Sequence, residues 1–330
     1  MATVGLTGAT GFIGGAVLPA LLASGYEVRS LDNRSGPVRV EYPDRPVPNL
    51  DFASDAGLAQ LRDCDVLLHL AAVSGVMACA SDPVGSARTN IAGTARLFEQ
   101  CRVRRIPVAF ASSFAVVGSP DRLPVTEATP ARPTHEYARQ KAEGERLVEW
   151  LGREGGVATA AVRQSNVYGG YRANSRYIAK GNVIQVFAQQ VGSGRLTVNA
   201  PGTQRRDFVH LEDVVAHWLA VARYLLRDGT VAGPTTINVA SGESLSVLEV
   251  ADKVAACYHR WAPTAGEVRI EVVPNPRGGV ELVEPSFAVS RVETERRLGV
   301  RCQQTVESAL PAILGESGAL SPRSAGRTTG

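Results

Sequence analysis

Two side chains four residues apart offer acid–base chemistry. Tyr137 and Lys141 form the pattern Y-x-x-x-K and, on a helix, lie on one face. A free phenol has a pKa of ~10 and is a poor base at neutral pH. A nearby ammonium group favours the phenolate and brings Tyr137 toward use as a general base. The pattern therefore predicts proton abstraction from a hydroxyl group; the structural alternative is a half-buried tyrosine on a helix surface.

Two serines, Ser112 and Ser113, end an apolar segment ahead of this helix. In doubly wound α/β folds, ligands collect at the carboxyl edge of the sheet, where these serines are expected. Either serine could instead cap the strand end, an interpretation that suits Ser112 better than Ser113.

A glycine-rich segment predicts a dinucleotide site. Gly8, Gly11 and Gly14 directly follow the first expected strand and open a helix. Glycines permit a tight turn there and let backbone amides approach a pyrophosphate at the positive end of the helix. Asp32 ends the next strand, where a carboxylate accepts the adenosine ribose hydroxyls and repels a 2′-phosphate. The cofactor predicted is NAD rather than NADP, a preference that Arg34 could soften.

The elements that must position these residues alternate between strands and helices. Short apolar runs predict strands, and amphipathic spacing with stop signals predicts helices. Such alternation is typical of an α/β fold, a doubly wound parallel sheet (Rossmann) with helices on both faces. The expected strands are 3–7, 27–31, 65–70, 108–112, 157–162 and 235–239, and the expected helices are 12–24, 83–102, 136–153, 212–227 and 246–259.

The alternation weakens after Asn166, which predicts a smaller discontinuous C-terminal substrate-binding domain. The expected dinucleotide-binding domain covers 1–166, with 207–239 returning to it. The substrate-binding domain takes 167–206 and 240–314. The segment 315–330 is rich in Ser, Gly, Arg and Thr and predicts a flexible tail.

Composition narrows the possible partners of this 330-residue chain. Its net charge of +3 comes from 35 basic and 32 acidic residues that are interspersed, so no nucleic acid partner is expected. The five cysteines form no C-x-x-C pair and the five histidines are scattered, which predicts no metal site and fits a reducing cytoplasm. Glycines and Pro19 interrupt the apolar beginning of the chain, so no membrane segment is expected.

The glycine spacing, Leu70-Ala71-Ala72 and the later Asn90-x-x-Gly93-Thr94 together resemble the extended short-chain dehydrogenase/reductase family. The resemblance implies that Ser113 shares the reacting proton with Tyr137 and that Asn90 orients the active-site region. It also implies that Asp51 and Phe52 flank the adenine and that Lys141 hydrogen-bonds the nicotinamide ribose. The expected NAD-binding residues are Gly8, Gly11, Phe12, Ile13, Gly14, Asp32, Asn33, Asp51, Phe52, Leu70, Ala71, Ala72, Asn90, Tyr137 and Lys141.

Matches in 163–169, 182–184, 196–198 and 202–213 are similar to the nucleotide-sugar epimerase/dehydratase group of that family. The partner that this implies is a nucleoside diphosphate sugar, whose phosphates need cations and amide donors. Arg206 is favoured over Arg277 for this purpose, the alternative for either being a solvated surface charge. The expected substrate-binding residues are Ser113, Asn166, Asn182, Val183, Arg206 and Arg277.

The segment after Ser113 bears on the reaction. Dehydratases and decarboxylases of this group carry carboxylates there, whereas residues 114–118 read F-A-V-V-G. The resemblance therefore favours transient oxidation at sugar C4 by an NAD-dependent 4-epimerase of the UDP-hexose type. The alternatives are an NAD(P)H-dependent 4-ketoreductase of deoxysugar biosynthesis and a non-catalytic NAD sensor. An apolar stripe at 147–151 is either core or half of a four-helix bundle in a homodimer.

Overall fold

The structure is a computed structural model that describes residues 1–42, 44–227, 233–264, 266–275 and 287–319. The chain folds into two compact units. The first comprises 1–164, 214–239 and 290–301, and the second comprises 165–213, 240–289 and 302–330.

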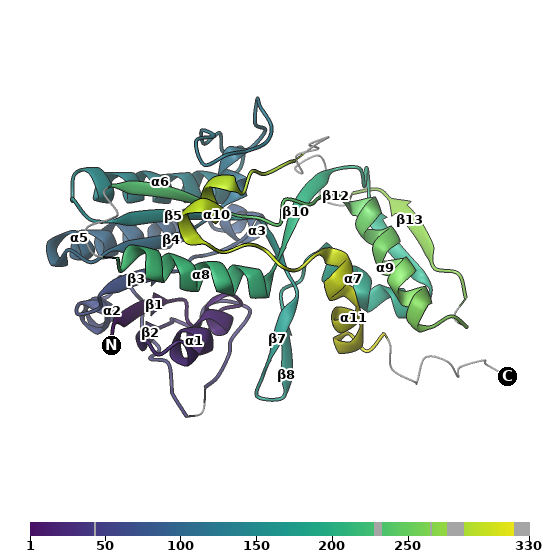
Figure 1. The fold of residues 1–330 in the computed structure, drawn as a ribbon, viewed down its shortest axis with the longest axis horizontal. Coiled ribbons are helices and arrows are strands. Elements are labelled where there is room, and N and C mark those ends of the chain that lie inside the picture. Colours follow the sequence, from purple (N-terminus) through teal and green to yellow (C-terminus); the bar gives the residue numbers. More distant parts are fainter. Residues whose placement is uncertain (43, 228–232, 265, 276–286, 320–330) are drawn as a thin grey trace. The chain divides into compact units, whose positions relative to one another are not determined.

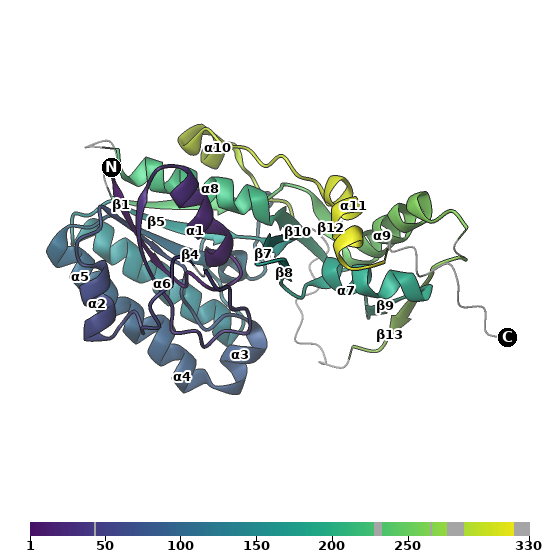
Figure 2. The ribbon, with the colours of Figure 1, turned by 90° about the horizontal axis from the view of Figure 1, so that it is seen from below.

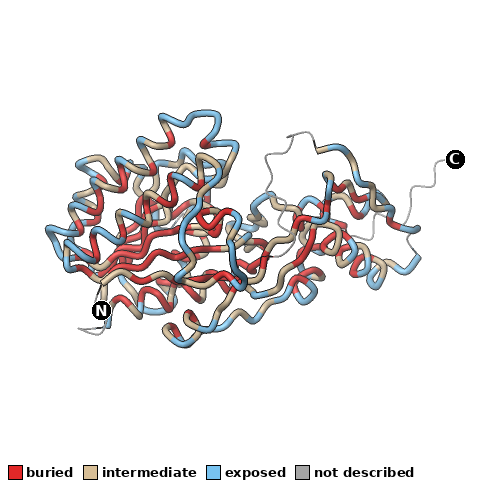
Figure 3. Tube along the Cα trace, turned by 90° about the horizontal axis from the view of Figure 1, so that it is seen from above, coloured by how far each residue is buried: buried red, intermediate tan, exposed pale blue. Residues whose placement is uncertain are grey.

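A six-stranded parallel sheet forms the centre of the first unit (Figure 1). Most residues of its strands are buried, as expected for a parallel sheet covered on both sides, and most of the strand traces appear in the buried colour in Figure 3. The predicted parallel α/β sheet is confirmed. Its order is β11-β5-β4-β3-β1-β2, with β1 at Thr3–Thr7, β2 at Glu27–Leu31, β3 at Val66–His69, β4 at Val108–Ser113, β5 at Thr159–Gln164 and β11 at Pro234–Val239.

Helices cover both faces of this sheet (Figure 2). On one face lie α1 (Gly14–Ala23) and α8 (Leu211–Leu225). On the other lie α2 (Asp55–Leu61), α5 (Thr94–Arg104) and α6 (Glu136–Arg153). Leu61, Phe98 and Leu151 from these three helices share one buried cluster with Leu67 and Val108 of the sheet.

The helix predicted over 83–102 is interrupted. The structure has α4 (Pro83–Ala87), a π-helical turn η1 (Arg88–Gly93) and then α5. Single π-helical turns are rare and frequently occur at functional sites. The remaining elements of this unit are α3 (Val76–Ser81), the 3-10 turn η2 (Phe114–Val117) and α10 (Val292–Leu298).

The second unit has its own core, which includes Tyr168, Phe187 and Leu310. Its sheets have the orders β12-β10-β6, β13-β9 and β7-β8. The elements are β6 (Asn166–Tyr168), β7 (Gly170–Ala173), β8 (Arg176–Ala179), α7 (Val183–Gln190), η3 (Val191–Ser193), β9 (Arg195–Asn199), β10 (Arg205–His210), β12 (Ser244–Ser246), α9 (Val247–Trp261), β13 (Arg269–Val273) and α11 (Val306–Glu316).

The two units differ from the predicted domain boundaries by two residues at 165–166, which group with the second unit, and by longer segments at 207–213 and 290–301. Residues 207–213 group with the second unit, because β10 pairs with β6 and β12 there. Residues 290–301 group with the first unit, because Thr294 of α10 hydrogen-bonds Asn238 of β11 and Glu127. The predicted tail at 315–330 lies mostly outside the described residues, although α11 extends to Glu316. Within the described ranges, none of the helices has the length and apolar character needed to cross a bilayer.

Candidate active site

The helix α6 carries the Y-x-x-x-K pair. It begins after His135, whose Nδ1 accepts the Ala138 backbone N–H at 3.2 Å and so caps the first turn. Tyr137 lies in that turn and Lys141 one turn later, with the Lys141 Nζ 6.0 Å from the Tyr137 ring centroid. The helical register predicted from the sequence is therefore the observed one.

Lys141 is held by the sheet beneath the helix. Its side chain is buried, and its Nζ donates to the Ala111 carbonyl oxygen on β4 at 2.7 Å. The same ammonium group lies 4.9 Å from the Phe110 ring centroid. These contacts fix the charge at the junction of α6 and β4.

The phenol of Tyr137 has two hydroxyl partners. Burial raises its pKa above the ordinary value, while hydrogen bonds with the side chains of Ser74 and Ser113 act to lower the pKa. In the protein alone, the direction is opposite to the expected lowering by Lys141. The physical reason is that burial disfavours the phenolate while the ammonium group is turned toward the Ala111 carbonyl.

The two serines at the end of β4 have different partners. The Ser113 hydroxyl accepts the Ala115 N–H at 3.2 Å and caps η2, in addition to its bond with Tyr137. The Ser112 hydroxyl instead donates to Glu145 of α6 at 2.6 Å. Ser113 thus reaches the phenol, whereas Ser112 fastens the strand to the helix.

Asn90 lies in the π-helical turn with its carboxamide fully used. Its Oδ1 accepts the Val73 N–H at 2.8 Å, and its Nδ2 donates to the Val73 carbonyl at 2.9 Å and to Gln140 Oε1 at 2.7 Å. Asn90 therefore joins the loop after β3 to α6, which is the way in which it can orient the active-site region.

The glycine turn joins β1 to α1 with little space to spare. Gly8 has φ +71°, and an added Cβ there would lie 2.8 Å from the Ala71 backbone nitrogen. An added Cβ on Gly14 would lie 2.0 Å from the Gly8 oxygen, whereas one on Gly11 meets that oxygen only at 3.3 Å. Gly11 is thus the glycine that packing requires least, as expected if it leaves room for a ligand. Phe12 is buried, and Ile13 precedes α1.

Asp32 lies directly beside this turn. Its carboxylate accepts the Thr10 N–H at 3.0 Å and the Arg34 N–H at 2.6 Å, which fixes its orientation. The Thr10 hydroxyl is buried and has no hydrogen-bond partner. The Asn33 carboxamide oxygen accepts both the N–H and the hydroxyl of Ser35. A fixed carboxylate, an available hydroxyl and the glycine backbone fit the ribose and phosphates of a dinucleotide.

The remaining predicted cofactor residues contribute backbone more than side chains. Asp51 is exposed and accepts the Ala53 N–H at 2.8 Å. The Phe52 ring is buried 4.8 Å from the His69 ring, so only the Phe52 main chain is left for an adenine. After β3, the N–H groups of Leu70 and Ala71 both donate to the Thr7 hydroxyl at 3.1 Å, and Ala72 follows them.

Ser113, the first of the predicted substrate residues, lies in the first unit, whereas Asn166, Asn182, Val183 and Arg206 lie in the second. Asn166 donates to the Asp207 carbonyl at 3.0 Å, and Arg206 donates to the Arg205 carbonyl at 2.8 Å. Asn182 caps α7 by accepting the Gln185 N–H at 3.0 Å, and Val183 packs on the core of this unit. The expectation for Arg277 lies outside the described residues.

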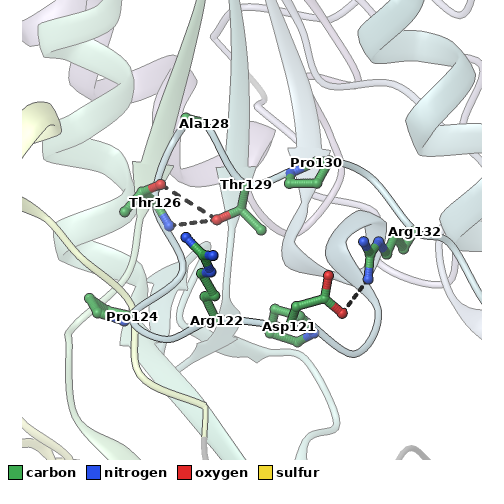
Figure 4. A pocket seen from close by; sticks show the side chains of 9 residues that line it. Asp121, Arg122, Pro124, Thr126, Ala128, Thr129, Pro130 and Arg132 are labelled. Carbon is green, nitrogen blue, oxygen red and sulfur yellow. Dashed lines mark hydrogen bonds and ion pairs between the residues drawn. The ribbon is translucent and has the colours of Figure 1, made fainter.

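A cavity of about 510 Å³ is lined by the loop between β4 and α6 (Figure 4). Thr129 closes the loop by accepting the Thr126 N–H at 2.9 Å, and Arg132 pairs with Asp121. The residues that line this cavity include neither Tyr137 nor the glycine turn. We therefore locate the candidate site from the hydrogen bonds of Tyr137 and not from this cavity.

Several residues of the site were not predicted from the sequence. Ser74 hydrogen-bonds Tyr137, and Gln140 bonds Asn90. Glu145 forms a buried ion pair with Arg163, whose Nη2 lies 2.8 Å from the carboxylate. Gln140 and Glu145 could have been suspected only from their position on the same helix as Tyr137. Nothing in the sequence indicates a role for Ser74.

Comparisons with known proteins agree with this geometry. Residues 4–240 match the model of the NAD dependent epimerase/dehydratase family. The putative UDP-glucose 4-epimerase of Methanocaldococcus jannaschii is 31% identical over 256 residues, covering 75% of this chain and 79% of that protein.

Two solved structures are similar over nearly the whole chain. The Thermus thermophilus UDP-glucose 4-epimerase in complex with NAD has a TM-score of 0.76 and 26% identity, covering 96% of this chain and 98% of its own. An NAD-dependent NDP-hexosamine 5,6-dehydratase of tunicamycin biosynthesis has a TM-score of 0.77 and 26% identity, covering 96% and 97%.

The predicted family and fold are thus confirmed, and so is the predicted cofactor, NAD. Among the described residues, no group of His, Cys, Asp or Glu side chains could hold a metal ion. The site combines a glycine turn beside a fixed carboxylate with a tyrosine and a lysine at the carboxyl edge of the sheet. The chain belongs to the NAD dependent epimerase/dehydratase family and is a nucleotide-sugar enzyme.

Proposed function

We propose that this protein is an NAD-dependent nucleotide-sugar 4-epimerase of the UDP-hexose type. The observation that carries the proposal is the phenol of Tyr137, hydrogen-bonded to Ser113 at the carboxyl edge of the sheet. UDP-glucose 4-epimerases among the relatives support the substrate class. The nucleoside diphosphate would be held by Asn166, Asn182, Val183, Arg206 and Arg277.

The proposed chemistry uses three side chains. Tyr137 accepts the proton of the sugar C4 hydroxyl, and Ser113 hydrogen-bonds the same oxygen. The glycine turn and Asp32 would hold NAD, which would supply an acceptor for the C4 hydride and a donor for its return. Lys141 places a positive charge beside the phenol from its site on the Ala111 carbonyl. The 4-keto sugar then rotates so that the opposite face of C4 is the one that receives the hydride. Tyr137 returns the proton to the C4 oxygen, and the opposite C4 configuration results.

The segment after Ser113 supports epimerisation over elimination. Elimination of water needs an acid and a base near the sugar C5 and C6. The turn η2 carries only Phe114, Ala115, Val116 and Val117, three of which are buried. No carboxylate therefore comes from this turn.

The first experiment is to incubate the purified protein with UDP-glucose, UDP-galactose and their N-acetyl and uronic forms, without added nicotinamide. Inversion at C4, followed by proton NMR, is the expected result. Absence of inversion, with oxidation of NAD(P)H by a 4-keto-6-deoxy sugar nucleotide, would replace the proposal by the ketoreductase reaction.

A tyrosine pair then tests the mechanism. Tyr137→Phe should lower the inversion rate by about 10² to 10⁴-fold, because the general base is lost. Tyr26→Phe is the matched control, because Tyr26 precedes β2 and thus lies at the opposite edge of the sheet. Equal inversion rates for the two variants would contradict the role of Tyr137 as the general base, whereas a non-catalytic NAD sensor would keep its biological effect in Tyr137→Phe.

We also propose that the protein acts as a homodimer. Of the apolar stripe on α6, Val148 and Leu151 are buried in the core, and Trp150 remains 38% exposed. Sedimentation of wild type and Trp150→Glu tests this proposal. The expected result is a dimer that the variant weakens, and a monomeric wild type would exclude it.

A further inference from the structure

The loop after β3 is fixed by two hydrogen bonds from one side chain. The Asn90 carboxamide accepts the Val73 N–H at 2.8 Å and donates to the Val73 carbonyl at 2.9 Å. The thiol of Cys79 donates to the same carbonyl at 3.5 Å. The main chain at Val73 therefore has little freedom to move.

This loop is tied in turn to the helix of Tyr137. The second N–H of the Asn90 carboxamide donates to Gln140 Oε1 at 2.7 Å, and both side chains are buried. The Gln140 amide nitrogen donates to Ser86 at 2.8 Å and to Glu136 at 2.9 Å. Because every polar atom of both carboxamides is used, the two residues form a rigid connection between the loop and α6.

Ser74 is the next residue along this fixed loop. It is exposed, yet its hydroxyl hydrogen-bonds the phenol of Tyr137. Gly75 follows with φ +113°, a conformation that turns the chain into α3. The phenol is thus held between hydroxyls from two strand ends, Ser74 after β3 and Ser113 at the end of β4.

We propose that Ser74 is a positioning residue for Tyr137, and that Asn90 and Gln140 hold Ser74 in place. The inference rests on the proposed function, in which Tyr137 is the base. When the sugar O–H bond breaks and the tyrosine O–H bond forms, the proton passes between those two oxygens alone. Ser74 donates a hydrogen bond to the phenolate before that transfer and keeps the ring aimed, with no bond of its own broken.

Ser74→Ala and Ser74→Thr provide the main test. Loss of the donated hydrogen bond makes the phenolate less stable, so Ser74→Ala should move the acidic limb of the kcat/KM profile to higher pH. The rate near pH 7 should fall on the order of tenfold, with the KM for sugar nucleotide unchanged. Ser74→Thr keeps a hydroxyl and should restore the profile. Ser81→Ala is the control, because the exposed Ser81 hydroxyl on α3 donates only to the Ala78 carbonyl.

Gln140→Met tests the connection. The variant keeps the side-chain length but cannot accept from Asn90, so its profile should shift in the direction of Ser74→Ala. If Gln140 acts through Ser74, the double variant should shift no further than Ser74→Ala alone. Additive shifts would overturn the proposed connection, and an unshifted Ser74→Ala profile would overturn the role of Ser74.

A spectroscopic titration separates this inference from the proposed function. The phenolate of Tyr137 is measured as the difference in absorbance near 295 nm between each protein and its Tyr137→Phe counterpart. Ser74→Ala should titrate at higher pH than wild type even if none of the tested sugar nucleotides reacts. The same midpoint in both proteins would contradict the inference whether or not C4 inversion is observed.

Discussion

The glycine turn at β1–α1 and the Tyr137 region at β4–α6 are built in different ways. The glycine turn depends on backbone shape, since Gly8 and Gly14 leave no room for a Cβ. The Tyr137 region depends on buried polar side chains that satisfy one another, such as Asn90 with Gln140. Crowding of a backbone turn and loss of a buried partner are distinct ways to damage a site.

The difference also appears in the sequence distance between partners. In the glycine turn, Gly11 hydrogen-bonds Gly8, three residues away. Around Tyr137, Ser112 reaches Glu145 across 33 residues, and Asn90 reaches Gln140 across 50. The first site is thus local in sequence, whereas the second exists only after the strands and helices have packed.

The largest effect on stability is expected from Glu145→Gln. Glu145 accepts from Ser112 at 2.6 Å and pairs with Arg163, with side chains only 12% and 6% exposed. Removing the carboxylate charge leaves the buried guanidinium uncompensated, at a cost of about 3–5 kcal/mol of unfolding free energy. Equilibrium urea unfolding measures this loss.

Glu143→Gln is the matched control on the same helix. Glu143 pairs with Arg146, but these side chains are 41% and 73% exposed, so the loss should stay below about 1 kcal/mol. Similar losses for the two variants would show that the Tyr137 region does not depend on its buried ion pair.

Gly14→Ala tests the glycine turn by the same measurement, the free energy of unfolding in urea. The new Cβ would lie 2.0 Å from the Gly8 oxygen, so the backbone must shift at a cost of about 1–3 kcal/mol. A stability equal to that of wild type would mean that the turn opens freely and that its glycines are not required by packing.

Much of the fold could be predicted from local patterns. The bounds of β1, β2 and α6 were predicted to the residue, because apolar runs and stop signals are local in the chain. The predicted helix over 83–102 was wrong at Asn90, where a hydrogen bond to Val73 accompanies a π-helical turn that no helix propensity encodes. The second unit was the least predictable, because its short strands lack a clear apolar alternation.

The candidate site follows the same division. Tyr137, Lys141 and the glycines stand in motifs with fixed spacing. Ser74 and Gln140 could not be predicted, because their roles come from contacts across 63 and 50 residues. The ion pair of Glu145 with Arg163 was likewise hidden, since a charged residue on a helix is usually solvated.

The His69 side chain hydrogen-bonds Thr7 at the end of β1 and feels the charge of Lys141 on α6. Its protonation therefore gives a test of stability against pH. The Thr7 hydroxyl accepts the N–H groups of Leu70 and Ala71, so its own proton goes to His69 Nδ1, 2.7 Å away. The opposite nitrogen, Nε2, then donates to the Thr94 hydroxyl at 3.1 Å. Burial, with the charge of Lys141 second, lowers the pKa of His69 to about 3.

The consequence is a loss of stability in acid. Between pH ~6.5 and ~3 the unfolded chain binds a proton at His69 that the folded protein does not. Unfolding free energy should therefore fall by about 1.4 kcal/mol per pH unit as the pH drops through this window, from this group alone. Urea unfolding from pH 7 to 4, for wild type and His69→Gln, measures the difference in slope. Parallel slopes would show that His69 is charged in the folded state.

The smallest effect on stability, and the sharpest on the cofactor, is expected from Gly11→Ala. An added Cβ meets only the Gly8 oxygen at 3.3 Å, so unfolding free energy should change by less than about 0.5 kcal/mol. If the backbone at Gly11 approaches the pyrophosphate, the methyl group occupies that space and NAD affinity should fall at least about tenfold by calorimetry. Gly266→Ala, with open space around the new Cβ, should leave both quantities unchanged. Normal NAD affinity in Gly11→Ala would show that the dinucleotide is held by Asp32 and the strand ends without close contact to this turn.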